Sequence, residues 1–202
     1  MRAGVLHLEN SNAPAVNSVL KKLGFSPFLT NNPDDLSSLS HLIIPGVGSF
    51  AAVAQEVRNM NSLPEALISF AQSGKPILGI CLGMQLLGNS SEESPGIPGL
   101  GMIDFNVVAM KSQDSQFPIP HVGWNQAHIK IDNPLFEGIP TETDFYFSHS
   151  FQVTDSRFRI AETRYSELFA SSVRKENIYG VQFHPERSQE YGHRILQNFL
   201  GM

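Results

Sequence analysis

A single cysteine lies between two glycines at the end of an apolar run. The segment at residues 79–83 has the pattern Gly-x-Cys-x-Gly, the thiol counterpart of the nucleophile elbow in which a strand turns sharply into a helix. Glycines on both sides remove the Cβ atoms that would clash in so tight a turn. The N-terminus of the following helix favours a thiolate, so the pattern predicts that Cys81 attacks a carbonyl carbon. A buried, inert cysteine is the alternative.

A candidate base lies about a hundred residues downstream, in the tripeptide His184-Pro185-Glu186. A neutral imidazole can take a thiol proton, and a carboxylate two positions along an extended chain lies on the same side as the ring. Glu186 is therefore expected to hold one ring nitrogen of His184 while the other faces the sulfur of Cys81. A strand-end histidine bonded to a backbone carbonyl is the alternative, because the tripeptide alone is a weak signal. The elbow upstream favours the triad.

Attack on an amide creates an oxyanion that needs preorganised donors. Residues 42–44 predict a short buried strand that leads into Pro45-Gly46-Val47-Gly48. The two glycines let the peptide near Val47 rotate and present its N–H, and the N–H of Leu82, next to the nucleophile, offers a second donor. An ordinary strand-to-helix loop explains the composition equally well.

The three segments together resemble the class I, triad-type glutamine amidotransferases, over nearly the whole chain. Within that class, further blocks are similar to the glutaminase subunits of imidazole glycerol phosphate synthase, and they lie at residues 91–93, 120–125 and 145–151. The Gly-Trp-Asn and His-Ser-Phe sequences in the last two blocks discriminate, because the elbow and His-Pro-Glu belong to the class at large.

The resemblance implies an activity and a partner. Glutamine would be hydrolysed to glutamate and ammonia through a glutamyl thioester, with no cofactor and no metal. Ammonia would pass to a (β/α)8-barrel synthase subunit, in a heterodimer that makes imidazole glycerol phosphate and AICAR in histidine biosynthesis. The same glutaminase serving another synthase, a free-standing cysteine hydrolase and a catalytically silent regulatory subunit are the alternatives.

The resemblance also implies roles for individual residues. Cys81, His184 and Glu186 match the triad, and the N–H groups of Val47 and Leu82 match the oxyanion hole. Contacts to the substrate glutamine are implied for Gly48, Gln85, Glu93, Ser150 and Phe151. Contacts to the synthase subunit are implied for Trp124, Asn125, Tyr146 and Arg187.

Two positions depart from the family pattern. Phe151 stands where the family often has tyrosine, which leaves only the backbone contact. The turn at residues 9–14 lacks the glycine that usually follows the first strand, and Asn10 and Asn12 are the candidates for its side-chain contact to the synthase.

Composition favours one domain over residues 1–202. A chain of 202 residues with 41% hydrophobic residues can bury roughly 70% of its unfolded surface. A net charge of −5 without a basic run argues against nucleic acid or an anionic membrane as partner. The single cysteine suits a reducing compartment, and neither a signal peptide nor a membrane-spanning run is found, so a cytoplasmic location is expected.

The apolar patterns predict an α/β fold of three layers, with helices on both faces of a mostly parallel central sheet and with extra antiparallel strands. In the first half, strands are expected at residues 3–8, 42–44 and 76–80, and helices at 13–23, 50–60, 63–73 and 84–88. In the second half, strands are expected at residues 103–110, 125–131, 145–153, 159–163, 168–173 and 178–183, with a closing helix at 191–200 and a loop at 92–101. The seven histidines are scattered and predict no metal site.

Overall fold

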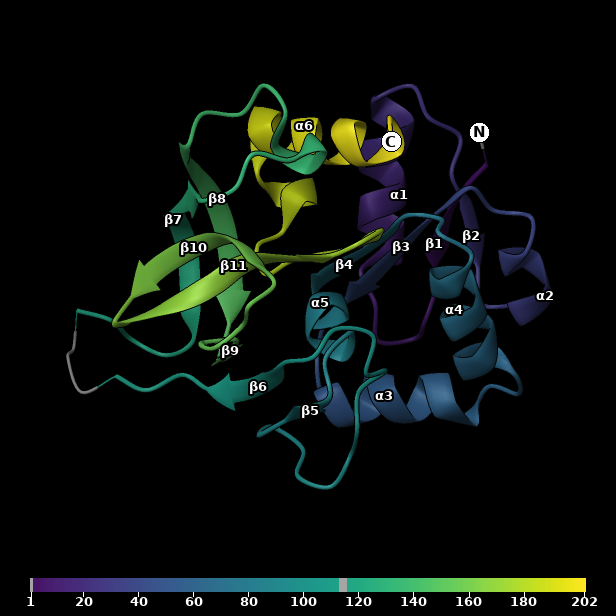
Figure 1. Ribbon diagram of the computed structural model, residues 1–202, viewed down its shortest axis with the longest axis horizontal. Helices are drawn as coiled ribbons and strands as arrows, with labels where there is room; N and C mark the ends of the chain where they lie inside the picture. Colours follow the sequence, from purple (N-terminus) through teal and green to yellow (C-terminus); the bar gives the residue numbers. More distant parts are fainter. Residues whose placement is uncertain (1, 113–115) are drawn as a thin grey trace.

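A large mixed sheet organises the computed structural model, which describes residues 2–112 and 116–202 (Figure 1). Its nine strands run in the order β2 (Phe28–Thr30), β1 (Ala3–Leu6), β3 (His41–Gly46), β4 (Ile77–Cys81), β12 (Ile178–Val181), β11 (Glu167–Lys175), β10 (Arg159–Tyr165), β7 (His121–Ile129) and β8 (Glu142–His149). The pairs from β2 to β12 are parallel. The pairs from β12 to β8 are antiparallel. A parallel half with antiparallel strands added at one side is the predicted fold.

Two layers of helices cover the sheet, and each has its own apolar core. Helices α1 (Ala13–Lys22) and α6 (Gln189–Leu200) pack on one face, whereas α2 (Pro33–Leu36), α3 (Phe50–Asn59), α4 (Leu63–Gln72) and α5 (Leu82–Leu86) pack on the other (Figure 1). Strand β3 is buried on both faces of the sheet, since Ile43 belongs to the first core while Leu42 and Ile44 belong to the second. Such continuous burial is typical of parallel strands.

Local signals set the ends of the helices. Helix α1 has Pro14 in its first turn and two lysines in its last, where they face the negative end of the helix dipole. The chain leaves this helix at Gly24, whose φ of +88° suits a glycine. These signals are local in sequence, which is why the predicted bounds agree within a residue or two.

The predicted strand over residues 145–153 is two strands in the structure. Strand β8 ends at His149, and β9 (Phe151–Gln152) joins a small second sheet with β6 (Asn106–Ala109) and β5 (Ser90–Ser91). The chain changes sheets because Phe151 and Gln152 pair with Ala109 and Val108. As a result, Ser150 lies at a break between two sheets, on the wall of a pocket.

Other differences concern short or shifted elements. Strand β2 and helix α2 were not predicted, because three and four residues give too little pattern to read. Strand β7 begins at His121, before the predicted 125, and β6 begins at Asn106, after the predicted 103. Two turns of 3₁₀ helix, η1 (Pro134–Phe136) and η2 (Pro185–Arg187), complete the fold.

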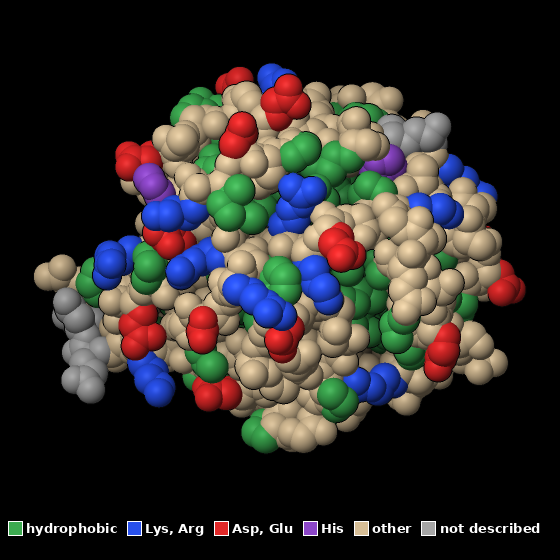
Figure 2. All heavy atoms as spheres, viewed as in Figure 1, with side chains coloured by type: hydrophobic (Ala, Val, Ile, Leu, Met, Phe, Trp, Pro, Cys, Tyr) green, Lys and Arg blue, Asp and Glu red, His purple; other side chains and the backbone are tan. Residues whose placement is uncertain are grey.

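The surface is mixed in charge. On the face shown in Figure 2, acidic and basic side chains are interspersed. None of the helices in residues 2–112 and 116–202 combines the length and apolarity needed to cross a membrane.

Candidate active site

The predicted elbow is present where β4 turns into α5. Cys81 ends the strand with a φ of 54° and a ψ of −112°, a conformation that is costly for a residue with a Cβ. A Cβ on Gly83 would lie 1.8 Å from the Ile44 carbonyl oxygen, and one on Gly79 would lie 2.7 Å from the backbone nitrogen of Met84. Glycine is therefore required on both sides, because the first turn of α5 packs directly against its neighbouring strands.

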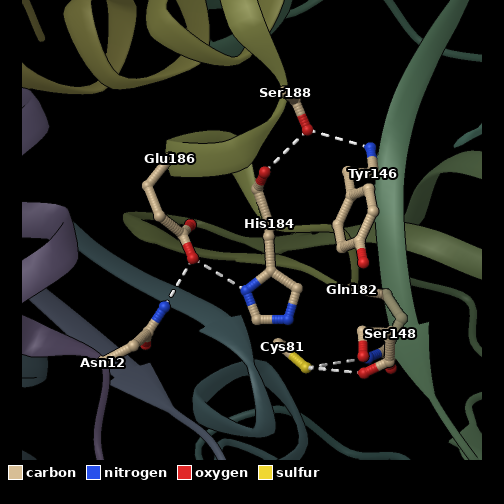
Figure 3. Close-up of polar contacts among 8 residues, drawn as sticks. All are labelled: Asn12, Cys81, Tyr146, Ser148, Gln182, His184, Glu186 and Ser188. Carbon is tan, nitrogen blue, oxygen red and sulfur yellow. Dashed lines mark hydrogen bonds and ion pairs between the residues drawn. The ribbon is translucent and has the colours of Figure 1, made fainter. Parts of the chain in front are cut away.

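His184 lies between a carboxylate and the sulfur of Cys81. Its Nδ1 is 2.8 Å from Glu186 Oε1, and both side chains are buried. Figure 3 shows the opposite edge of the ring turned towards Cys81. The backbone of His184 is held on both sides, because its N–H donates to the Tyr146 carbonyl at 2.8 Å and its carbonyl accepts from Ser188 Oγ at 2.6 Å. The 3₁₀ turn η2 brings Glu186 back beside the ring.

The charges around His184 favour its protonated form. Burial by itself lowers the pKa of the ring, but the charge and hydrogen bond of Cys81 and the carboxylate of Glu186 outweigh it and raise the pKa of His184 to about 10. At neutral pH the ring is therefore an imidazolium, which can act as a proton donor. The site thus places a proton donor beside a candidate nucleophile.

A pocket of about 580 Å³ opens over Cys81. It lies at the carboxyl ends of β3, β4 and β12, where ligands bind in open α/β sheets. The predicted site residues that line it, besides the triad, are Val47, Gly48, Leu82, Gln85, Glu93, Ser150, Phe151 and Arg187. The structure thus brings every predicted substrate and oxyanion residue to one cavity, although they come from four separate stretches of the chain.

The N–H of Val47 does not point into this pocket. It donates to the Asn10 carbonyl at 3.4 Å, and the next residue, Gly48, has a φ of +85°. Leu82 is the first residue of α5, next to Cys81. The predicted pair of oxyanion donors is therefore incomplete in this conformation, and the role of Val47 stays a prediction for a rotated loop.

Three of the four predicted partner contacts form one cluster beside the site. The guanidinium of Arg187 lies 4.1 Å above the Tyr146 ring, and Trp124 meets the same ring edge-on at 6.2 Å between centroids. Trp124 is 48% exposed.

Asn125, the fourth predicted partner contact, lies outside this cluster, because alternate residues of a strand face opposite sides. Its Nδ2 donates to the Arg164 carbonyl at 3.2 Å on the other face of β7. Its contact with a partner stays a prediction.

Asn10 and Asn12 were the two candidates for a side-chain contact to the synthase, but the structure turns Asn12 towards the triad. Its Nδ2 donates to Glu186 Oε1, the oxygen that also holds His184. Gln182 was not singled out, yet its Nε2 lies 3.7 Å from the sulfur of Cys81. The sequence does contain a signal for Gln182, because it is a polar residue inside the apolar run before His184. A fully buried amide must have hydrogen-bond partners, so such a residue is a candidate for the site.

A pair of histidines lies at the wall of the pocket, which His149 lines. His121 Nδ1 is 3.0 Å from His149 Nε2, and His149 Nδ1 donates to the Phe151 carbonyl at 2.9 Å. Burial lowers the pKa of His121 to about 4 and that of His149 to about 3. No group of three or more His, Cys, Asp or Glu side chains suited to a metal ion occurs among the residues that the structure describes.

We expect this pair to make the fold sensitive to acid. The unfolded chain binds protons on these rings below about pH 6.5, whereas the folded rings stay neutral down to about 4 and 3. The free energy of unfolding should therefore fall as the pH drops below 6.5, by up to about 1.4 kcal/mol per pH unit for each ring. Urea unfolding between about pH 7 and 5 measures this loss. Ring NMR signals of His121 and His149 that titrate near 6.5 would contradict it.

Comparisons with known proteins agree with this geometry. The family model described as glutamine amidotransferase class-I matches residues 6–202. The chain is 44% identical over 192 residues to the imidazole glycerol phosphate synthase subunit HisH of Yersinia pseudotuberculosis, and the match covers 95% of each protein. It is 41% identical over 202 residues to the HisH subunit of Escherichia coli K12, with 100% of each covered.

The fold agrees as well. A solved glutamine amidotransferase structure superposes with a TM-score of 0.77 at 20% identity, and the match covers 100% of this chain and 98% of the other. An identity this low supports the fold alone. The family model and the HisH relatives go further, and together they establish that the chain belongs to the class I glutamine amidotransferases, in the family of HisH subunits of imidazole glycerol phosphate synthase.

Proposed function

We propose that this chain hydrolyses glutamine with Cys81, His184 and Glu186 and supplies the ammonia to a separate synthase subunit in histidine biosynthesis. The observation that carries the proposal is the setting of one cysteine. Cys81 lies on a strained elbow and lines a pocket together with the residues expected to contact glutamine, and a buried His–Glu pair lies beside its sulfur. The names of the HisH relatives support the assignment to imidazole glycerol phosphate synthase.

The chemistry follows from the charges. The anionic sulfur of Cys81 attacks the side-chain amide carbon of glutamine and forms a tetrahedral oxyanion. The imidazolium of His184 gives its proton to the departing nitrogen, which leaves as ammonia, and a glutamyl thioester remains. Neutral His184 then takes a proton from water, whose oxygen attacks the thioester and releases glutamate. Glu186 keeps the ring oriented and stabilises the imidazolium.

The amino-acid end of glutamine is proposed to bind at the far wall of the pocket. Glu93 offers a carboxylate to the α-ammonium group, and Gln85 lies one turn beyond the nucleophile on α5. The backbone of Ser150 and Phe151 lies at the break between β8 and β9, where it is proposed to hold the α-carboxylate. No side-chain hydroxyl is needed there, so the replacement of the family's tyrosine by Phe151 is compatible with binding.

The synthase subunit is proposed to dock against Trp124, Tyr146 and Arg187. The HisH relatives are named as subunits of imidazole glycerol phosphate synthase, so the acceptor chemistry is proposed to lie on another subunit. The backbone of Tyr146 is connected to the base. Its N–H donates to Ser188 Oγ at 2.9 Å, and Ser188 Oγ donates to the His184 carbonyl. The Tyr146 carbonyl also accepts from the His184 N–H at 2.8 Å, so a partner seated on this cluster would lie one hydrogen bond from the backbone of the base.

The test is to mix the chain with the barrel synthase subunit of its own organism and to measure glutamate release and glutamine-dependent formation of imidazole glycerol phosphate. We expect both. Glutamate release without that product would assign the chain to another acceptor synthase. No glutamate release with any partner would show a silent regulatory subunit and would contradict the proposal.

Removal of the supports of His184 should reduce turnover in a defined order. We expect His184→Ala to cause the largest loss, Glu186→Gln a smaller one, and Asn12→Ala about a tenfold loss, because one hydrogen bond to a buried carboxylate is worth about 1.5–3 kcal/mol. Steady-state glutaminase assays of the complex measure the order.

The matched control is Asn10→Ala, which changes an amide side chain in the same turn and keeps the backbone carbonyl that Val47 uses. It should leave the triad unaffected. Glu186→Gln should also lower the pKa of His184 from about 10, because it removes a negative charge next to the ring. A larger loss from Asn12→Ala than from His184→Ala would contradict the assignment of His184 as the base.

A further inference from the structure

A chain of buried hydrogen bonds links the substrate wall of the pocket to the nucleophile. Gln85 Nε2 donates to the Phe151 carbonyl at 3.1 Å and to Gln182 Oε1 at 3.0 Å. Gln182 Nε2 in turn lies 3.7 Å from the sulfur of Cys81 (Figure 3). Gln182 is completely buried and Gln85 is 3% exposed, so water does not compete for these contacts.

The donor and acceptor of each of these hydrogen bonds follow from the chemistry of the groups. A backbone carbonyl can only accept, so Gln85 must turn its NH₂ group towards Phe151. The same NH₂ group faces Gln182, which must answer with its carbonyl oxygen. The NH₂ group of Gln182 is then left to face Cys81. The reverse orientation of Gln182 would oppose two donors and would place a carbonyl oxygen against the sulfur, so only the first orientation satisfies both contacts.

Besides His184, the sulfur of Cys81 has two polar neighbours with opposite preferences. The Ser148 carbonyl oxygen, 3.9 Å away, can accept a proton from a thiol and disfavours an anion. The N–H of Gln182 cannot accept a proton, and a hydrogen bond from it is stronger to an anionic sulfur than to a thiol or a thioester. The donor from Gln182 therefore favours the form of Cys81 that attacks.

We propose that Gln182 is a further catalytic residue, which donates an N–H to the Cys81 sulfur and stabilises it as the attacking and leaving thiolate. No proton is transferred by Gln182. When the sulfur attacks the amide carbon, the hydrogen bond weakens as the negative charge moves to the oxygen, and it is restored when water displaces the sulfur from the thioester. Gln85 has a positioning role here, because it holds Gln182 in the orientation that presents the N–H.

The inference rests on the proposed glutaminase only for its kinetic consequence. The state of the sulfur can be tested without glutamine or a partner, because Cys81 is the only cysteine of the chain. Alkylation by iodoacetamide at neutral pH depends on the thiolate, so its rate reports directly on this hydrogen bond.

The sharpest variant is Gln182→Glu. It keeps the length of the side chain and an oxygen for Gln85, and it replaces the NH₂ group that faces the sulfur with a carboxylate oxygen. We expect alkylation of Cys81 to slow by about tenfold or more, since a charge-assisted donor is replaced by an acceptor. Gln182→Met, which keeps the volume and removes the polar group, should slow it as well. Circular dichroism and thermal unfolding show whether each variant is folded, and an unchanged rate in a folded variant overturns the proposal.

A measurement on a variant with an intact Gln182 keeps the test valid if both substitutions prevent folding. In protein labelled with ¹⁵N at glutamine side chains, the NH₂ signal of Gln182 should shift between the wild-type chain and Cys81→Ala, because the alanine variant has no sulfur to accept. An unshifted signal overturns the proposal. Failure of the glutaminase proposal would not affect this result or the alkylation rate.

Steady-state kinetics of glutamine hydrolysis separate a catalytic role of Gln182 from a structural one. In the complex with the synthase subunit, Gln182→Glu should lower kcat for glutamine hydrolysis by about tenfold and change KM by less than about twofold, because an interaction made with the reacting atom affects the chemical step. A raised KM with unchanged kcat would show that Gln182 acts only through Gln85 and the substrate wall, and would overturn the assignment.

Discussion

Replacement of Cys81 by alanine is expected to abolish glutamine hydrolysis and to leave ammonia-dependent synthesis intact. Without the sulfur no thioester forms, so the loss should reach about 10⁴-fold or more. The fold should tolerate the change, because one small side chain replaces another at a position whose backbone is held by the elbow. The measurements are glutamate release by the complex and product formation with an ammonium salt at high pH, where free ammonia is abundant.

The ammonia assay gives this variant its control. A complex that carries Cys81→Ala and still makes product from ammonium shows that the partner is folded and that only ammonia generation is lost. Normal glutamine turnover in the folded variant would contradict the mechanism. Loss of both activities would mean that this subunit also shapes the acceptor site of its partner.

The second large effect concerns the partner. The isolated chain is expected to be a poor glutaminase, and the synthase subunit with its acceptor nucleotide is expected to activate it by about 10²–10³-fold, the usual effect of one oxyanion donor. The reason is the loop at residues 45–49, where the Val47 N–H donates to the Asn10 carbonyl and not into the pocket. Gly48 permits the peptide to rotate, since it has no Cβ to oppose a change of φ.

The free energy required to rotate the loop at residues 45–49 is modest. The Val47–Asn10 bond is long, at 3.4 Å, while the turn that carries Asn10 is held by the Glu9 N–H, which donates to Glu56 Oε1 at 2.6 Å. A partner therefore needs to supply only a few kcal/mol of differential binding to favour the rotated loop, since about 1.4 kcal/mol is a factor of ten. Glutaminase rates of the chain alone, with the synthase subunit, and with that subunit plus nucleotide measure the effect. Equal rates in all three would contradict gating and favour a free-standing hydrolase.

The sequence by itself determined the elbow around Cys81, the pairing of His184 with Glu186 and the class of fold. The elbow could be identified because its glycine pattern is local to the cysteine: Gly79 is required by the turn itself, at the Met84 nitrogen, although Gly83 is required by the Ile44 carbonyl of the neighbouring strand β3. The pair His184 and Glu186 is local too, since His184 directly precedes the 3₁₀ turn that places the Glu186 carboxylate at its ring. Alternating apolar runs likewise predicted the parallel half of the sheet and the helices on both of its faces.

Only the tertiary structure decided which distant polar groups meet. Asn12 reaches Glu186 across 174 positions of the chain, and Gln182 meets Gln85 and Cys81 from the residue that follows β12. A side chain's partner across the fold depends on strand order and register, which no local pattern contains. The same holds for the Val47 N–H, whose acceptor on Asn10 comes from the turn after β1, because that turn and the loop after β3 lie at the ends of neighbouring parallel strands.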